Sequence, residues 1–144
     1  MASDHVRDLI QVILVDGEDD PRVRTSIEGL GPKKAATVVS AAFTEAVLDK
    51  WRHGATLENI RDYVREVRAQ VESENKPSQH VAEALIRAVL HEDLIIRDIP
   101  GDEVFRGQIW LTYEIVNGRY TDEAARQRFV DETVTVANQW LEQA

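Results

Sequence analysis

The residues whose types and spacing most suggest chemistry form a glycine-rich turn followed by two lysines: Gly29, Gly31, Lys33 and Lys34. Glycines let the backbone approach a ligand closely, and the first N–H groups of the helix that Pro32 begins have no partner within that helix. These N–H groups and the positive end of the helix dipole together favour an anion. The lysines would add positive charge to such an anion-binding turn.

Residues 27–38, with the sequence IEGLGPKKAATV, resemble the helix-hairpin-helix motif. In that family a hydrophobic-Gly-hydrophobic-Gly turn joins two short helices. The positions of the motif are filled here by Gly29, Leu30, Gly31, Pro32, Lys33 and Ala35. The resemblance implies a contact with a DNA backbone phosphate that does not depend on base sequence. It covers 12 of the 144 residues.

Charge is distributed unevenly along the chain, which has 17 Lys and Arg against 26 Asp and Glu and a net charge of −9. Residues 21–55 are the positive segment, with six basic and three acidic residues. A net negative charge repels polyphosphates, and affinity for nucleic acid grows with the number of phosphates neutralised. Nucleic acid is therefore the disfavoured alternative partner, and its candidate contacts are Gly29, Gly31, Lys33, Lys34, Arg22 and Arg24.

Large aromatic residues indicate a second kind of site, a protein interface. Trp and Tyr are common among the residues that dominate binding energy at interfaces, although Trp is also mostly buried in protein cores. Trp110 lies off the apolar face of its expected helix. The candidate interface residues are Trp110, Trp51 and Tyr63.

An apolar stripe in steps of three and four runs through residues 57–74, formed by Leu57, Ile60, Val64, Val67 and Val71. Such a narrow stripe is typical of an antiparallel bundle contact or a coiled-coil seam. The leading interpretation is therefore a non-enzymatic interaction or regulatory module that binds a protein partner or forms a homodimer.

Motifs for catalysis, metals and cofactors are absent from the sequence. The chain has no cysteine, which excludes disulfides and thiolate sites. Asp16, Glu18 and Asp20 have the alternate spacing of calcium ligands, but Pro21 and Ile27 occupy the places of the required Gly and Glu. We expect no catalytic residue, metal or cofactor. An enzyme or a small-ligand pocket within the bundle is a third alternative, because a pocket cannot be recognised from one sequence.

The first apolar run, residues 9–15, is far shorter than the ~20 residues of a membrane-spanning helix. The lone Arg7 near the start is flanked by Asp4 and Asp8, which is unlike a signal peptide. We therefore expect a cytoplasmic protein that does not contact a membrane.

Hydrophobic periodicity predicts a single all-α domain, residues 1–144, with seven helical segments. Residues 32–53 are apolar around most of the helix, which predicts a compact multi-helix bundle built around this central segment. Thr56 and Ser78 are expected helix caps. Residues 94–113 allow either a helix that begins near Asp102 and ends at Gly118, which we favour, or a short β-hairpin.

Overall fold

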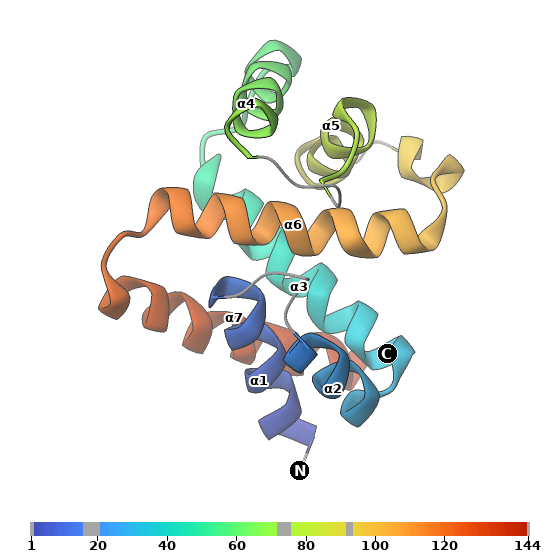
Figure 1. The fold of residues 1–144 in the computed structure, drawn as a ribbon, viewed down its shortest axis with the longest axis vertical. Coiled ribbons are helices and arrows are strands. Elements are labelled where there is room, and N and C mark those ends of the chain that lie inside the picture. Colours follow the sequence, from blue (N-terminus) through green and yellow to red (C-terminus); the bar gives the residue numbers. More distant parts are fainter. Residues whose placement is uncertain (1, 16–20, 72–75, 92–93, 144) are drawn as a thin grey trace.

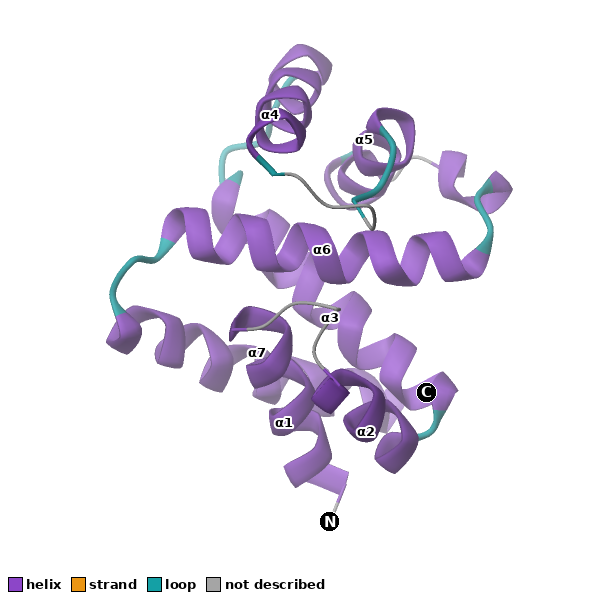
Figure 2. Cartoon of the chain, in the orientation of Figure 1, coloured by secondary structure: helices purple, strands orange, loops and turns teal. Residues whose placement is uncertain are grey.

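The computed structural model describes residues 2–15, 21–71, 76–91 and 94–143. This part of the chain contains helices and loops and no strand (Figure 2), so the predicted all-α class is confirmed. The helices are α1 (Ala2–Val15), α2 (Pro21–Leu30), α3 (Pro32–Lys50), α4 (Leu57–Gln70), α5 (Gln79–Leu90), the 3-10 helix η1 (Leu94–Asp98), α6 (Gly101–Arg119) and α7 (Glu123–Gln143).

Helix α6 crosses the middle of the molecule in Figure 1, with α4 and α5 on one side and α1, α2 and α7 on the other. Helix α3 passes behind α6 and packs against α1, α2, α5, α6 and α7. Its middle is buried, as the 1% exposure of Phe43 illustrates. Exposed residues remain along α3, namely Pro32, Lys33, Lys34, Ala36 and Leu48. The helix thus joins the two sides of the bundle without being enclosed all round.

Side chains next to the helix starts explain where α4 and α5 begin. The Thr56 hydroxyl accepts a 3.0 Å hydrogen bond from the Asn59 N–H, and the Asn59 side-chain oxygen accepts one of 3.2 Å from the Thr56 N–H. The Ser78 hydroxyl accepts a 3.1 Å bond from the Val81 N–H. Each bond satisfies an N–H that the first helical turn leaves without a partner. Both predicted caps are confirmed.

The β-hairpin considered for residues 94–113 is wrong, because this segment forms η1 and most of α6. Gly118 does not end α6 as expected, since the helix continues to Arg119 and Gly118 does not have the positive φ of a helix stop. Helix α3 ends at Lys50, earlier than predicted, because Trp51 leaves the helical conformation. The chain then turns at Gly54, whose φ is +83°, and leads to α4.

Two expectations concern membranes and metals. No helix among the described residues is long and apolar enough to cross a membrane. Within that same part of the chain, no group of three or more His, Asp or Glu is arranged to hold a metal ion. Asp16, Glu18 and Asp20, with their calcium-like spacing, lie outside the described residues.

Candidate functional site

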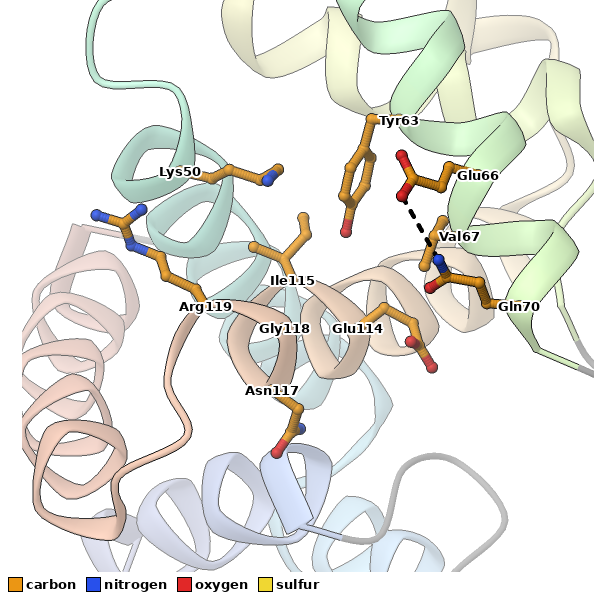
Figure 3. A pocket seen from close by; sticks show the side chains of 10 residues that line it. All are labelled: Lys50, Tyr63, Glu66, Val67, Gln70, Glu114, Ile115, Asn117, Gly118 and Arg119. Atoms are coloured by element: carbon orange, nitrogen blue, oxygen red, sulfur yellow. Dashed lines mark hydrogen bonds between the residues drawn. The ribbon is translucent and has the colours of Figure 1, made fainter.

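A half-open pocket of about 670 Å³ lies where the end of α3 meets α4 and α6. Ten residues line it (Figure 3): Lys50, Tyr63, Glu66, Val67, Gln70, Glu114, Ile115, Asn117, Gly118 and Arg119. They come from the consecutive helices α3 and α4 and from α6, which lies much later in the chain. This volume lies within the range of small-molecule sites, about 300–1,000 Å³.

The turn between α3 and α4 positions one wall of the pocket. The Trp51 N–H donates a 3.0 Å bond to the Val47 carbonyl, and the Gly54 N–H donates one of 2.9 Å to the Trp51 carbonyl. The chain turns here, and Tyr63 on α4 lies next to Trp51 at the end of α3. The rings of Trp51 and Tyr63 meet edge to face, with centroids 5.2 Å apart and planes at 90°. This is a favourable geometry for two aromatic rings.

Lys50 is held over both rings of this pair. Its ammonium nitrogen lies 4.6 Å from the centroid of Tyr63 and 5.3 Å from that of Trp51, within the range of cation–π attraction. It makes no ion pair with any residue that the structure describes. Burial, with help from the nearby positive charge of Arg119, lowers the pKa of Lys50. The charge of Glu66, at longer range, acts in the opposite direction and raises this pKa. An anion would therefore find here a cation that has no ion-pair partner among the described residues.

Arg119, the other cation of the pocket, is already paired. Its Nε donates a 2.8 Å bond to Asp49 Oδ2, and the Tyr120 hydroxyl donates to the same oxygen. Arg52 donates a 2.9 Å bond to Asp49 Oδ1. Burial acts to raise the pKa of Asp49, but the bonds from Tyr120 and Arg52 and the charge of Arg119 outweigh it and lower the pKa. This cluster fastens the end of α6 to α3.

Carboxylates occupy the side of the pocket opposite Lys50. Burial raises the pKa of Glu114, which has no hydrogen bond or ion pair among the described residues. Glu66 accepts a long bond of 3.5 Å from Gln70. Burial and the charges of Glu114 and Glu66 raise the pKa of Tyr63, so its phenol stays protonated at neutral pH. Removing the Glu114 carboxylate from water carries a cost that a bound cation would offset.

Asn117 also lines the pocket, but its side chain serves the fold. Its amide nitrogen donates bonds of 2.6 Å and 2.9 Å to the carbonyls of Leu14 and Tyr113. Its oxygen accepts a 3.1 Å bond from Arg126. These bonds tie α6 to the C-terminal end of α1 and to α7, and they occupy the groups that could otherwise meet a ligand.

The glycine turn lies at the other end of α3. Gly31 alone separates α2 from α3, with φ at +92°, and its N–H donates a 2.8 Å bond to the Ile27 carbonyl. That N–H is therefore used within the turn and is not directed at a ligand. A Cβ at Gly29 would come within 2.7 Å of the His5 ring, so Gly29 permits the close packing of α1 on α2.

The candidate phosphate contacts are all on the surface, except that Gly31 is only half-exposed. Lys33 and Lys34 lie in the first turn of α3, and Arg22 and Arg24 lie on α2. The structure thus places the four cations on two consecutive helices. Lys33 and Lys50 are separated by almost the whole 19-residue helix, which spans about 28 Å.

The three aromatic residues predicted to form an interface have different surroundings in the structure. Trp110 is only 6% exposed and belongs to the core, so it is not available to a partner, and this part of the prediction is corrected. The apolar residues around it on α6 face several helices, which leaves no outer face for the indole. Trp51 and Tyr63 are partly buried and contact each other at the pocket.

The apolar stripe on α4 is largely covered by other helices of the same chain. Ile60, Val64 and Val67 are buried, and α5 packs against α4. Leu57, at the start of the stripe, is 54% exposed. The stripe therefore acts mainly as a contact between helices of the same chain.

Lys50, Glu66 and Glu114 were not among the site residues predicted from the sequence. The available signal for Lys50 was a lysine directly before a tryptophan at the end of an otherwise apolar helix.

In comparisons with known proteins, no family model, curated protein or solved structure matches this chain.

Proposed function

We propose that the protein is a non-enzymatic binding module whose pocket between α3, α4 and α6 takes a small ligand. The observation that supports this best is Lys50, whose ammonium group lies over two aromatic rings inside a 670 Å³ pocket without a carboxylate partner among the described residues. No group of residues arranged to hold a metal ion accompanies it in that part of the chain, and binding is the simpler role. Location in the cytoplasm stays a prediction.

The proposal also accounts for the arrangement around α3. This central helix carries Lys50 at its end, and its contacts with α6 fix the distance between Lys50 and the residues of α6 that line the pocket. Helix α4 is held mainly by α5, with the pocket beneath it. A rigid frame with charged groups at fixed places is what selective binding requires.

Screening a fragment library by ¹H–¹⁵N NMR tests the proposal, with neutral, anionic, cationic and zwitterionic compounds included. We expect shifts to concentrate at Gly118, Lys50 and the Trp51 indole. Gly118→Leu should weaken every such fragment by roughly tenfold or more, because a side chain there enters open space at the pocket. Gly101→Leu, at the other end of α6 and also facing open space, is the matched control. A library without any fragment that shifts these signals would exclude the proposal.

A protein partner is the second candidate, favoured by two exposed large hydrophobic residues that flank the turn between α3 and α4. Leu48 is 46% exposed and Leu57 54% exposed. If this corner mediates self-association, the wild type sediments as a dimer and the Leu48→Ser, Leu57→Ser double variant as a monomer. A wild type that stays monomeric at every concentration removes the self-associating form of this proposal.

A further inference from the structure

The pocket has two poles of opposite charge. Figure 3 shows Lys50 on one side of the Tyr63 ring, with the carboxylates of Glu66 and Glu114 on the other. The first pole is a cation without an ion-pair partner among the described residues, and the second contains a carboxylate, Glu114, that likewise has no partner among them. Each pole is therefore available to a ligand group of opposite charge.

Two apolar side chains, Ile115 and Val67, contribute to the pocket wall between the poles. Ile115 is 2% exposed and Val67 8% exposed, and both line the pocket beside the ring of Tyr63. An aliphatic body would contact these side chains while charged groups at its ends reached the two poles. The hydrophobic contribution from such contacts is about 25 cal/mol per Å² of apolar surface removed from water.

Ligands with one sign of charge fit this arrangement less well. A polyanion such as a nucleotide would meet two carboxylates and only one uncompensated cation, since Arg119 is bound to Asp49. A polycation would place positive charge against Lys50. Like charges at a site of this kind are repulsive and act against binding.

We propose that the ligand is a small zwitterion with an apolar body, whose carboxylate pairs with Lys50 and whose ammonium pairs with Glu114 and Glu66. This inference rests on the proposed binding function and adds the chemical class of the ligand. The pocket volume suits a molecule larger than a single amino acid. A dipeptide with free termini and aliphatic side chains has the required groups.

Leucyl-leucine and three capped derivatives test this class by isothermal titration calorimetry. N-acetylation removes the ammonium group, C-terminal amidation removes the carboxylate, and the doubly capped peptide has neither. We expect leucyl-leucine to bind, and each single cap to weaken binding by about tenfold or more, because a charge-assisted hydrogen bond is lost. The doubly capped peptide should bind weakest.

Variants then assign each charge to its pole. Lys50→Gln should weaken leucyl-leucine but leave the affinity of leucyl-leucinamide, which has no carboxylate, nearly unchanged. Glu114→Gln should weaken leucyl-leucine but not its N-acetyl derivative. This selective loss is the signature of a direct pair in a double-mutant cycle. Lys33→Gln on α3 and Glu103→Gln on α6 are exposed controls outside this pocket, and they should change neither affinity.

The outcomes separate this inference from the proposed function. Capped and uncapped peptides that bind equally, or an amide that binds best, would overturn the zwitterion while leaving a binding pocket in place. Absence of binding by leucyl-leucine while NMR fragments still shift the pocket residues would do the same. If neither the peptides nor any fragment binds, both proposals are wrong. Thermal melting of each variant verifies that it is folded.

Discussion

The two ends of α3 carry lysines in opposite surroundings. At the N-terminal end, Lys33 and Lys34 are exposed and project from the outer surface of a helix. At the C-terminal end, Lys50 is partly buried, lies over two aromatic rings and faces a pocket. The N-terminal pair follows a motif that sequence inspection detects, whereas the local sequence at Lys50 shows only a lysine directly before a tryptophan at the end of an apolar helix.

The difference shows that the surroundings of a charge decide how much it can contribute to binding. Water and salt screen an exposed lysine, so that two such residues support only weak and salt-dependent contacts. A lysine inside a pocket is screened less, and its interactions are correspondingly stronger. Geometry at the second end of α3, rather than the motif at the first, therefore supports a specific function.

The largest effect in this comparison is expected from Gly31→Ala. Gly31 has φ +92° and ψ 151°, a region open almost only to glycine. We expect the substitution to lower the free energy of unfolding by about 1–3 kcal/mol, measured by urea denaturation. Ligand affinity at the pocket should not change, because about 28 Å of helix separates the two ends.

Gly118→Ala is the matched control at the pocket end. Gly118 has a helical conformation and faces open space, so alanine should stabilise the protein slightly, by about 0.5–1 kcal/mol. A Gly31→Ala variant that is folded but binds pocket ligands less tightly would contradict the independence of the two ends. It would mean that α3 transmits a change along its length.

The starts of α3, α4 and α5 were predicted well from sequence, because their causes are local. Pro32 begins α3, and the side chains of Thr56 and Ser78 each bond to an N–H three residues later. Such interactions depend on a few consecutive residues. Where a boundary depended on a glycine alone, as at Gly118, the prediction was wrong, because the backbone there stays helical.

A smaller effect is expected at the exposed end, where the helix-hairpin-helix hypothesis predicts weak binding to DNA. Two lysine–phosphate contacts make affinity fall by roughly tenfold between 50 and 200 mM salt. Lys33→Glu combined with Lys34→Glu should abolish any retardation of duplex DNA in a low-salt gel. The same double variant should bind pocket ligands normally. Wild-type protein that leaves DNA mobility unchanged at the lowest salt would exclude phosphate contact by this turn.

The pocket was not predictable, because its charged residues come together only through packing. Lys50, Tyr63 and Glu114 lie on three helices, and no periodicity within one segment encodes the distance between them. Trp110 shows the same limit of prediction from sequence, here for a residue that was expected to be exposed and is buried. Its position off the expected apolar face suggested exposure, yet neighbouring helices cover it. Both outcomes depend on contacts between residues far apart in the sequence.

The smallest expected effect is on the pH dependence of stability, which Glu114→Gln should change. Burial raises the pKa of Glu114 in the folded protein above its ordinary value of 4.5. Between the ordinary pKa and the raised pKa, the Glu114 carboxyl group is ionised in the unfolded chain but still protonated in the folded protein. Rising pH therefore lowers the free energy of unfolding until the folded form has also ionised. Glu114→Gln removes this loss. The variant should therefore gain stability over the wild type between pH 4 and pH 7, as measured by urea denaturation at both values.

Glu103→Gln gives the opposite expectation on the same helix. Glu103 is exposed in the first turn of α6, where a negative charge suits the helix dipole, so its removal should lower stability at pH 7 slightly. A Glu114→Gln variant that is less stable than the wild type at pH 7 would show that the carboxylate is already satisfied within the fold. Glu114 would then have no need of a ligand cation, and the contrast between the two ends of α3 would rest on Lys50 alone.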